Sequence, residues 1–266
     1  MTVPALAPPP ASSAAPTEVT GATGDAAAPA PETSAPPPAE PAPPAAEPAP
    51  APPPADAPVI APYNTVLGWH GDDKIAYLTF DDGPGPYTGR VLDILASAGV
   101  KATFCEIGQR VTEEPSLTQR VVAEGHTLCN HSWDHHSPFD GLSPAELDSE
   151  IARTQDAFVQ ATGVTARYLR APEGRFGVVG GTVEQAAQRA RTLPLGWGVD
   201  SLDWQKPGPD AIVANVLNTV SPGAIILMHD GGGTDRDQTL AALPRIISGL
   251  QAAGYTLEPL PPDPGG

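Results

Sequence analysis

Proline is distributed so unevenly that it divides the chain into two parts. Of the 35 prolines, 20 lie at or before Pro62, in a stretch made almost entirely of Ala, Pro, Ser, Thr, Glu and Gly. Such a stretch has too few large apolar side chains to offset the entropy lost on folding. We therefore expect residues 1–62 to form a disordered, partly extended tail or linker. Residues 63–266 have a length typical of one domain and are expected to carry the fold.

The charge balance argues against several classes of partner. The formal net charge is −17, and the folded part is acidic as well as the tail. Nucleic acids and anionic membranes bind basic surfaces, so neither is expected as a partner. No run of about 18 apolar residues is present, so no transmembrane segment is predicted. The first residues also lack the basic and apolar regions of a signal peptide, so secretion has to be inferred by other means.

From Ile75 onward, short apolar runs alternate with helical patterns, which is typical of β/α units around a parallel sheet. The predicted strands are 75–80, 101–106, 126–130, 166–170, 195–199, 224–228 and 255–258. The predicted helices are 86–98, 115–124, 143–162, 182–191, 210–219 and 238–253. The helix at 143–162 begins with a capping box, Ser143 to Glu146. This pattern predicts an α/β fold, a distorted (β/α) barrel with about seven parallel strands; an open doubly wound sheet is the alternative.

Polar clusters follow five of the predicted strands, at the edge where ligands bind in both architectures. The clusters are Asp81-Asp82-Gly83-Pro84, His131-Ser132-Trp133-Asp134-His135, Arg170-Ala171-Pro172, Asp200-Ser201-Leu202-Asp203-Trp204 and His229-Asp230. These clusters contain nearly every charged or imidazole group that a hydrolase needs. The sequence therefore predicts one site at this edge of the sheet.

The spacing of His131 and His135 suits two nitrogen ligands of one metal ion. A nearby carboxylate would complete a three-ligand site with an open position, of the kind that zinc uses to activate water. Of the adjacent Asp81 and Asp82, one is expected to be a ligand and the other a base, and the spacing leaves open which is which. A solvated turn is the alternative for this pair. His70, His126 and His136 lie outside these motifs and are interpreted as structural or surface residues.

His229, Trp204 and the pair of cysteines allow two interpretations each. His229 follows an apolar strand, so it is either a core histidine or the acid that protonates a leaving amine. Either Asp203 or Asp200 would orient its imidazole. Trp204 would offer a flat face to a sugar ring or an acetyl methyl group, or else pack in the core. Cys105 and Cys129 lie in two predicted strands, so neighbouring strands in a secreted protein would allow a disulfide; two small core residues are the alternative.

Together, the five clusters resemble the ordered motifs of the polysaccharide deacetylases, carbohydrate esterase family four, over about residues 70–257. The resemblance implies a distorted β/α barrel with a divalent metal, usually Zn²⁺, with Co²⁺ also possible. It implies that Asp82, His131 and His135 are the metal ligands and that Asp81 is the catalytic base.

The resemblance also assigns the remaining site residues. It implies that Arg170 holds Asp81 and that Asp203 tunes His229, the general acid. Leu227 and Trp204 would line the acetyl pocket. The backbone N–H of Glu173 would help to bind the oxyanion, at a position where an aromatic residue is common in the family.

These assignments imply a hydrolase that removes acetyl groups from N-acetylglucosamine residues of chitin, chitooligosaccharides or peptidoglycan. The expected partner is an acetylated polysaccharide, and the protein is expected to be a monomer that is secreted or associated with the cell wall. An esterase acting on O-acetyl groups of xylan is the nearest alternative. A glycan-binding protein that lost its chemistry is a further alternative, although no ligand, base or acid position is vacant.

Overall fold

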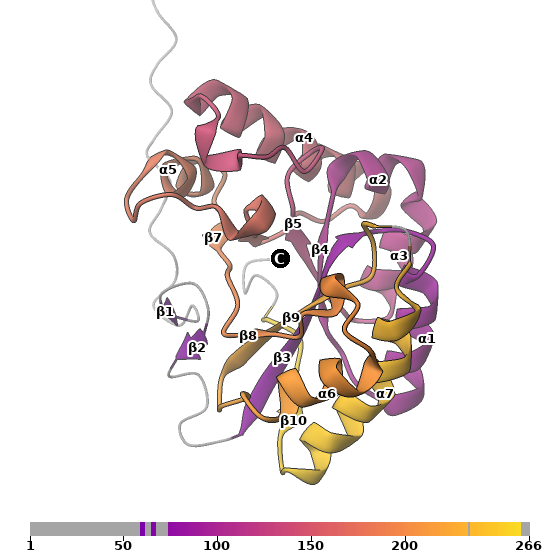
Figure 1. Cartoon of the computed structure of the whole chain (residues 1–266). Helices are drawn as coiled ribbons and strands as arrows, with labels where there is room; N and C mark the ends of the chain where they lie inside the picture. Colours follow the sequence, from indigo (N-terminus) through magenta and orange to yellow (C-terminus); the bar gives the residue numbers. More distant parts are fainter. Residues whose placement is uncertain (1–58, 62–64, 68–73, 234, 262–266) are drawn as a thin grey trace, which may run out of the picture. The chain divides into compact units, whose positions relative to one another are not determined.

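The computed structural model describes residues 59–61, 65–67, 74–233 and 235–261, which form one sheet with helices around it (Figure 1). The strands are β1 (Val59–Ala61), β2 (Thr65–Leu67), β3 (Ile75–Gly83), β4 (Thr103–Glu106), β5 (Thr127–Asn130), β6 (Tyr168–Leu169), β7 (Leu193–Pro194), β8 (Val199–Asp200), β9 (Ala224–His229) and β10 (Thr256–Leu257). The α-helices are α1 (Thr88–Ala98), α2 (Gly108–Glu113), α3 (Pro115–Ala123), α4 (Pro144–Thr162), α5 (Thr182–Arg189), α6 (Pro209–Leu217) and α7 (Asp237–Ala252). Three 3₁₀ turns are η1 (Phe139–Gly141), η2 (Pro172–Gly174) and η3 (Asp203–Gln205).

Seven strands run parallel in the order β8, β9, β3, β4, β5, β6, β7. β7 and β8 form the two edges of this series, and within residues 193–200 no backbone pairing joins them. The sheet is therefore a curled half-barrel, open between β7 and β8. This confirms the predicted distorted α/β barrel of about seven parallel strands, rather than an open doubly wound sheet.

Three shorter strands extend this sheet. β10 pairs with the first residues of β3, and β2 pairs antiparallel with β1 and with the start of β9. The residues of β1 fall within the predicted tail, residues 1–62. The rest of that tail, and the predicted boundary between residues 62 and 63, lie outside the described residues.

β1 and β2 were not predicted, and two elements after residue 74 also differ from the sequence prediction. The strand predicted at 195–199 is replaced by β7 and β8 with a break between them. The carbonyl groups of Leu195 and Gly196 in this break accept hydrogen bonds from the side chain of Arg170, which takes the place of a strand partner. Helix α2 was not predicted, because six residues are too few to show a helical repeat. By contrast, the capping box of Ser143 and Glu146 at the start of α4 is confirmed.

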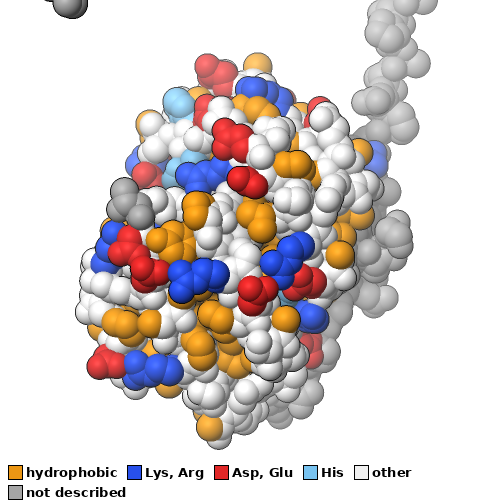
Figure 2. Space-filling view, turned by 90° about the vertical axis from the view of Figure 1, so that its right-hand side faces the viewer, with side chains coloured by type: hydrophobic (Ala, Val, Ile, Leu, Met, Phe, Trp, Pro, Cys, Tyr) orange, Lys and Arg blue, Asp and Glu red, His pale blue; other side chains and the backbone are white. Residues whose placement is uncertain are grey.

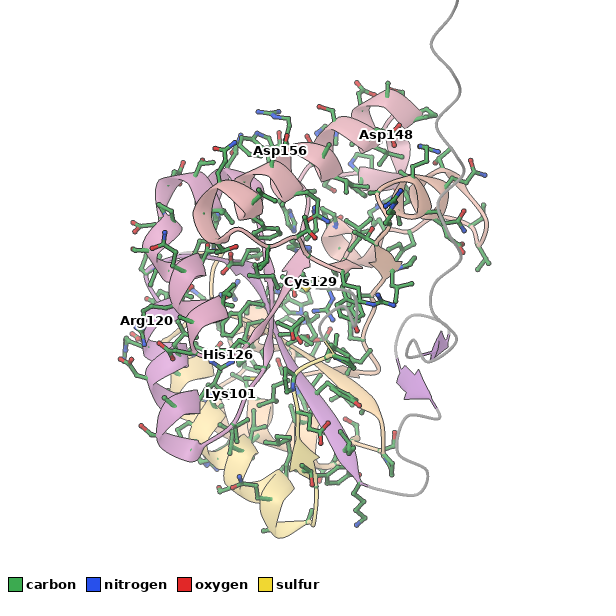
Figure 3. All side chains as sticks on the ribbon, turned by 180° about the vertical axis from the view of Figure 1, so that it is seen from behind. Lys101, Arg120, His126, Cys129, Asp148 and Asp156 are labelled. Atoms are coloured by element: carbon green, nitrogen blue, oxygen red, sulfur yellow. A yellow bond between two sulfur atoms is a disulfide. The ribbon has the colours of Figure 1, made fainter. Side chains whose placement is uncertain are left out.

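The two faces of the sheet pack into different clusters. On β3, Ala76, Leu78 and Phe80 belong to the cluster that contacts the helices, whereas Tyr77 faces the inside of the curled sheet. The inner cluster also holds the Cys105–Cys129 disulfide, which joins the neighbouring strands β4 and β5 at paired positions. Figure 3 shows Cys129 among the strands, and Asp148 and Asp156 outside on α4.

The segment after β10 covers the amino-terminal end of the sheet. Leu260 is fully buried, its N–H donates to the Thr103 hydroxyl (3.0 Å), and its carbonyl accepts from Thr127 (2.6 Å). The Tyr168 hydroxyl donates to the carbonyl of Pro261 (3.0 Å). These contacts fill the end of the half-barrel that is opposite the predicted site. Among the described residues, none of the helices has the length and apolar character needed to cross a bilayer.

Candidate active site

A pocket of about 390 Å³ opens at the carboxyl ends of the strands, where the sequence predicted a site. The predicted catalytic, metal and substrate residues that line it are Asp81, Asp82, His131, His135, Glu173, Trp204, Leu227 and His229. Arg170 and Asp203 lie behind this lining, where each contacts one of its members. The structure therefore brings together all ten residues that the sequence analysis assigned to the site.

A β-bulge explains how two consecutive aspartates reach the same pocket. Asp81 pairs with Cys105 of β4, but Gly83 pairs with the next residue, Glu106, so Asp82 is an extra residue in β3. In a regular strand, neighbouring side chains point to opposite faces of the sheet. The bulge, with Asp82 in the left-handed conformation at φ 69°, turns its carboxylate toward the pocket that Asp81 also lines.

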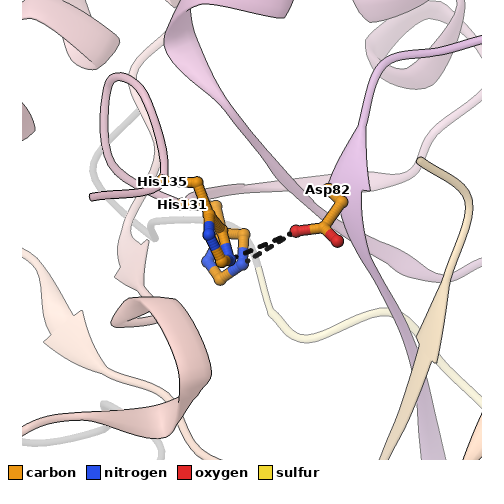
Figure 4. A group of neighbouring side chains, drawn as sticks. All are labelled: Asp82, His131 and His135. Atoms are coloured by element: carbon orange, nitrogen blue, oxygen red, sulfur yellow. Dashed lines mark ion pairs between the residues drawn. The ribbon is translucent and has the colours of Figure 1, made fainter. Parts of the chain in front are cut away.

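Asp82, His131 and His135 form a cluster suited to a divalent cation (Figure 4). Oδ1 of Asp82 lies 3.4 Å from Nε2 of each histidine, and all three ligand atoms lie within 4.8 Å of one another. Among the described residues, this buried Oδ1 has no hydrogen-bond partner. A carboxylate oxygen and two imidazole nitrogens are a typical zinc donor set with an open position. The residues present therefore fit the metal that the sequence predicted.

The hydrogen bond of His131 fixes which of its ring nitrogens faces the cluster. Nδ1 lies 2.8 Å from the carbonyl oxygen of Arg170, which can only accept, so Nδ1 carries the hydrogen. The lone pair is then on Nε2, the atom that faces Asp82. Burial opposes ionisation of Asp82, but the nearby imidazoles of His131, His229 and His135 hold its pKa well below the usual range.

The two histidines lie in a loop that is held from α4. Glu150 of α4 accepts the backbone N–H groups of Trp133 (2.9 Å) and Asp134 (3.3 Å). Within the loop, the Ser132 hydroxyl accepts the N–H of His135 (3.0 Å). This loop brings the two imidazole rings to a centroid distance of 5.0 Å, which is the convergence that their spacing predicted.

Asp81 is held by a buried arginine. Nη1 of Arg170 donates to Oδ1 of Asp81 (2.7 Å) and to the Thr79 hydroxyl (2.8 Å), while its other nitrogens donate to the carbonyls of Leu195 and Gly196. Arg170 has no solvent exposure. A buried, charge-assisted pair of this kind fixes the position of the carboxylate.

His229 is paired with Asp203 on the other side of the pocket. Oδ1 of Asp203 lies 2.7 Å from Nδ1 of His229, and Oδ2 accepts the backbone N–H of His229 (3.0 Å) and the hydroxyl of Thr239 (2.7 Å). Burial alone would lower the pKa of His229, but the Asp203 carboxylate outweighs it and raises that pKa. Nε2 is left to face the pocket. Of the two aspartates considered from sequence, Asp203 contacts the imidazole, whereas Asp200 accepts the N–H of Leu202.

The outer wall of the pocket is aromatic and acidic. Trp204 is 51% exposed, so core packing is not its role, while Leu227 is buried beneath the pocket. Glu173 adopts a left-handed conformation at φ 56°, and its carboxylate accepts a hydrogen bond from Ser137 (2.9 Å). Trp197 also lines the pocket and lies against Gly174, where an added Cβ would be 2.7 Å from the indole ring.

Sequence reasoning missed three contributors, namely Trp197, Arg236 and Thr239. Trp197 was placed inside a predicted strand, and Thr239 inside a predicted helix, where neither had a distinguishing signal. Arg236 lines the pocket shortly after Gly231, Gly232 and Gly233. That run of glycines was the available signal, since it indicates a close approach of the backbone to another group.

The other histidines lie away from the pocket lining. His126 is buried and its Nδ1 accepts the N–H of Ala102 (3.0 Å), so its role is structural. His136 is exposed beside the metal cluster, and the cluster is formed with His135. His70 lies outside the described residues.

The fold and the site together define a class of protein: a half-barrel hydrolase with an Asp-His-His group that could hold a metal ion, flanked by a carboxylate and a histidine. The sequence model of the family described as polysaccharide deacetylase matches residues 70–191. The chain is 40% identical over 202 residues to a chitooligosaccharide deacetylase of Rhizobium leguminosarum bv. trifolii, covering 71% of this chain and 92% of that relative. The chain therefore belongs to the polysaccharide deacetylase family, carbohydrate esterase family 4.

Two further relatives extend this likeness. The chain is 38% identical over 187 residues to a peptidoglycan-N-acetylglucosamine deacetylase of Bacillus cereus, covering 69% of this chain and 85% of that relative. The solved structure of a family 4 carbohydrate esterase from Streptomyces lividans in complex with acetate superimposes with a TM-score of 0.66 at 35% identity, covering 73% of this chain and 97% of that one. Both matches span most of the relative's length, so the likeness is to whole deacetylase domains.

Proposed function

We propose that this protein is a zinc-dependent hydrolase that removes acetyl groups from N-acetylglucosamine residues of a polysaccharide and releases acetate. The observation that carries the proposal is the arrangement of the pocket. Asp81 and His229 both line the pocket that holds the Asp82–His131–His135 cluster, and each is held by its own buried partner. Relatives named for deacetylation of chitooligosaccharides and of peptidoglycan N-acetylglucosamine support the substrate class.

Each side chain has a role in this hydrolysis. A zinc ion held by the cluster would supply a Lewis acid for the acetyl carbonyl and make a water molecule more acidic. Asp81, oriented by Arg170, accepts the proton of the attacking water, whose oxygen forms the new C–O bond. The N–H of Glu173 would donate to the oxyanion. Nε2 of His229 gives a proton to the nitrogen as the C–N bond breaks, so the products are acetate and a free amino sugar.

Further features of the protein support a glycan substrate and a location outside the cytoplasm. The exposed face of Trp204 and the indole of Trp197 offer flat apolar surfaces of the kind on which sugar rings stack. The face shown in Figure 2 carries Lys and Arg side chains interspersed with Asp and Glu, without the basic stretch that nucleic acid would need. The Cys105–Cys129 disulfide supports an oxidising compartment, as expected for a secreted or cell-wall enzyme.

The test is mass spectrometry of products after incubation of the zinc-loaded protein with N-acetylated chitooligosaccharides, peptidoglycan fragments and O-acetylated xylooligosaccharides in separate reactions. We expect loss of acetyl groups from the N-acetylglucosamine substrates, no loss after chelation, and loss of most turnover in Asp81→Asn with zinc still bound. Asp156→Asn, on the exposed side of α4, makes the same chemical change away from the site and should retain full activity.

An O-acetyl esterase is the second candidate, because an ester is attacked more easily than an amide by the same groups. Acetyl loss from the xylooligosaccharides alone would assign that activity in place of the proposed one. Acetyl loss that persists after complete removal of metal, or full turnover of Asp81→Asn, would contradict the proposed mechanism.

A further inference from the structure

The loop that follows β9 lies directly against Asp82. An added Cβ at Gly231 would overlap the carbonyl oxygen of Asp82, and one at Gly232 would overlap its Oδ2. Gly232 also adopts φ 62°, which favours glycine. The two glycines therefore allow the loop backbone to pack on the aspartate without an intervening side chain.

The backbone of Asp82 is also held by α2. Nη1 of Arg110 donates to the carbonyl oxygen of Asp82 at 2.6 Å. Asp82 itself is the extra residue of the β-bulge and has a left-handed backbone conformation. These contacts fix where its side chain starts, but they do not decide which carboxylate oxygen faces the histidines.

Arg236 lies beside Oδ2, the other carboxylate oxygen of Asp82. Its Nη2 is 3.8 Å from Oδ2 of Asp82, too far for a hydrogen bond but within reach of an ion pair. Its Nε donates to the carbonyl of Gly231 at 2.8 Å, which ties the guanidinium to the same loop. Arg236 is 6% exposed, so it is poorly accessible to a glycan even though it lines the pocket. Its charge therefore acts on the protein rather than on the substrate.

The two oxygens of Asp82 thus have different surroundings. Oδ2 faces Arg236 and Gly232, whereas Oδ1 lies 3.4 Å from Nε2 of both histidines and is without a hydrogen-bond partner in the described part of the chain. We infer that Arg236 is a positioning residue: it holds Oδ2 so that Oδ1 is the single oxygen that Asp82 offers to the metal. This inference rests on the proposed metal site and assigns to Arg236 a role that none of the five motifs contains.

The test measures zinc binding, which does not depend on deacetylation. Zinc affinity is measured by competition with a chromogenic chelator for the wild type, Arg236→Met and Arg236→Lys. We expect Arg236→Met to bind zinc about 10–100-fold more weakly, the range typical when a partner of a metal ligand is removed. Arg236→Lys keeps the charge and should retain more of the affinity. Arg245→Met, which removes an exposed arginine from α7, is the matched control and should bind as the wild type does.

The visible absorption spectrum of the Co²⁺-loaded proteins is the second readout, because it reports coordination geometry and is insensitive to a general loss of stability. We expect a changed spectrum for Arg236→Met and a spectrum close to that of the wild type for Arg236→Lys. Thermal unfolding of the metal-free variants shows whether each is folded. If Arg236→Met does not fold, the comparison of Arg236→Lys with the wild type decides the inference by the same two readouts.

Two results would overturn the inference. One is an Arg236→Met protein that binds zinc as tightly as the wild type with an unchanged Co²⁺ spectrum. The other is tighter binding, which would mean that Arg236 acts only by repelling the cation. A wild-type protein that binds no zinc would instead overturn the proposed function, so the two failures are distinguishable.

Discussion

Replacement of Asp203 by Asn would test how the site delivers a proton to its leaving group. The Asp203 carboxylate is buried and accepts three hydrogen bonds: from Nδ1 and the backbone N–H of His229, and from the hydroxyl of Thr239. Asparagine has one carbonyl oxygen in place of two carboxylate oxygens. Its better orientation points that oxygen at the two donors on the Oδ2 side, which leaves the amide NH₂ facing Nδ1.

This orientation changes the state of His229 in two ways. Nδ1 must now accept a hydrogen bond from the asparagine NH₂. The imidazole is therefore held in its neutral form with the single hydrogen on Nε2, and it lacks the second proton that a general acid donates. The lost charge also lowers the pKa of His229, which Asp203 raises in the wild type. A hydrogen bond to a charged group typically contributes about 1.5–3 kcal/mol, so its loss disfavours the protonated ring of His229.

The sign of the pH effect follows from the role of the group. Protonated His229 is the active form, so activity falls as pH rises through its pKa. The alkaline limb of the kcat profile of Asp203→Asn should therefore move to lower pH than that of the wild type. Loss of a general acid typically lowers the rate about 10²–10⁴-fold.

The assay compares two substrates that differ in their need for this proton. An N-acetylated chitooligosaccharide has a poor amine leaving group, whereas an aryl acetate releases a phenolate without protonation. We expect Asp203→Asn to lose at least about 100-fold in kcat on the amide and less than about tenfold on the ester. Thr239→Val is the control, since it removes one hydrogen bond of about 1 kcal/mol but keeps the charge. Equal losses on the two substrates would refute the assignment of His229 as the general acid.

Two further predictions concern stability. Leu260→Ala should lower the free energy of unfolding by about 2–5 kcal/mol, because it empties a fully buried position at the end of the half-barrel. Urea unfolding measures this free energy, and Val164→Ala, at an exposed position, is the control. A loss of stability equal to that of the control would contradict the prediction. Burial, with Lys101 nearby, lowers the pKa of His126 from 6.5 to about 4. The unfolded state therefore binds the proton first, so stability should fall as pH drops from about 6.5 toward 4. His126→Asn should show a smaller fall in the same urea titrations, and an equal fall would assign the effect to other groups.

The location of the site was predictable because parallel strands end at one edge. Five clusters separated by up to about 150 positions in the chain meet in one pocket for this reason alone. Which of Asp81 and Asp82 groups with both histidines was not predictable from spacing. It depends on a β-bulge, which appears only when the pairing of β3 with β4 is known.

Other features depend on contacts between distant segments. In the break between β7 and β8, the carbonyls of Leu195 and Gly196 accept hydrogen bonds from Arg170, a contact that no local propensity encodes. The role of Glu150 could not be predicted either, because in the sequence Glu150 is one of several acidic residues of a surface helix. Its carboxylate is identified as the anchor of the histidine loop only by the two N–H groups that it accepts.

The buried carboxyl groups around the pocket fall into two sets, which differ in their hydrogen-bond partners and in the direction of their pKa shifts. Asp82 and Asp203 face imidazoles, and the pKa of each is lowered despite burial. The carboxyl groups of Asp230 and Glu106 receive hydrogen bonds from the hydroxyls of Thr88 and Thr118. Burial, with the neighbouring carboxylates, raises the pKa of Asp230 to about 7 and that of Glu106 to about 8.

The difference between these pKa values determines where negative charge lies around the metal cluster. If all of these carboxyl groups were ionised, their mutual repulsion in a poorly solvated region would oppose folding. Protonation of Glu106, and partial protonation of Asp230, near neutral pH confines the negative charge to the positions next to Arg170, Arg236 and the histidines. The charge that remains is therefore concentrated where a divalent cation and a proton-donating imidazole would use it.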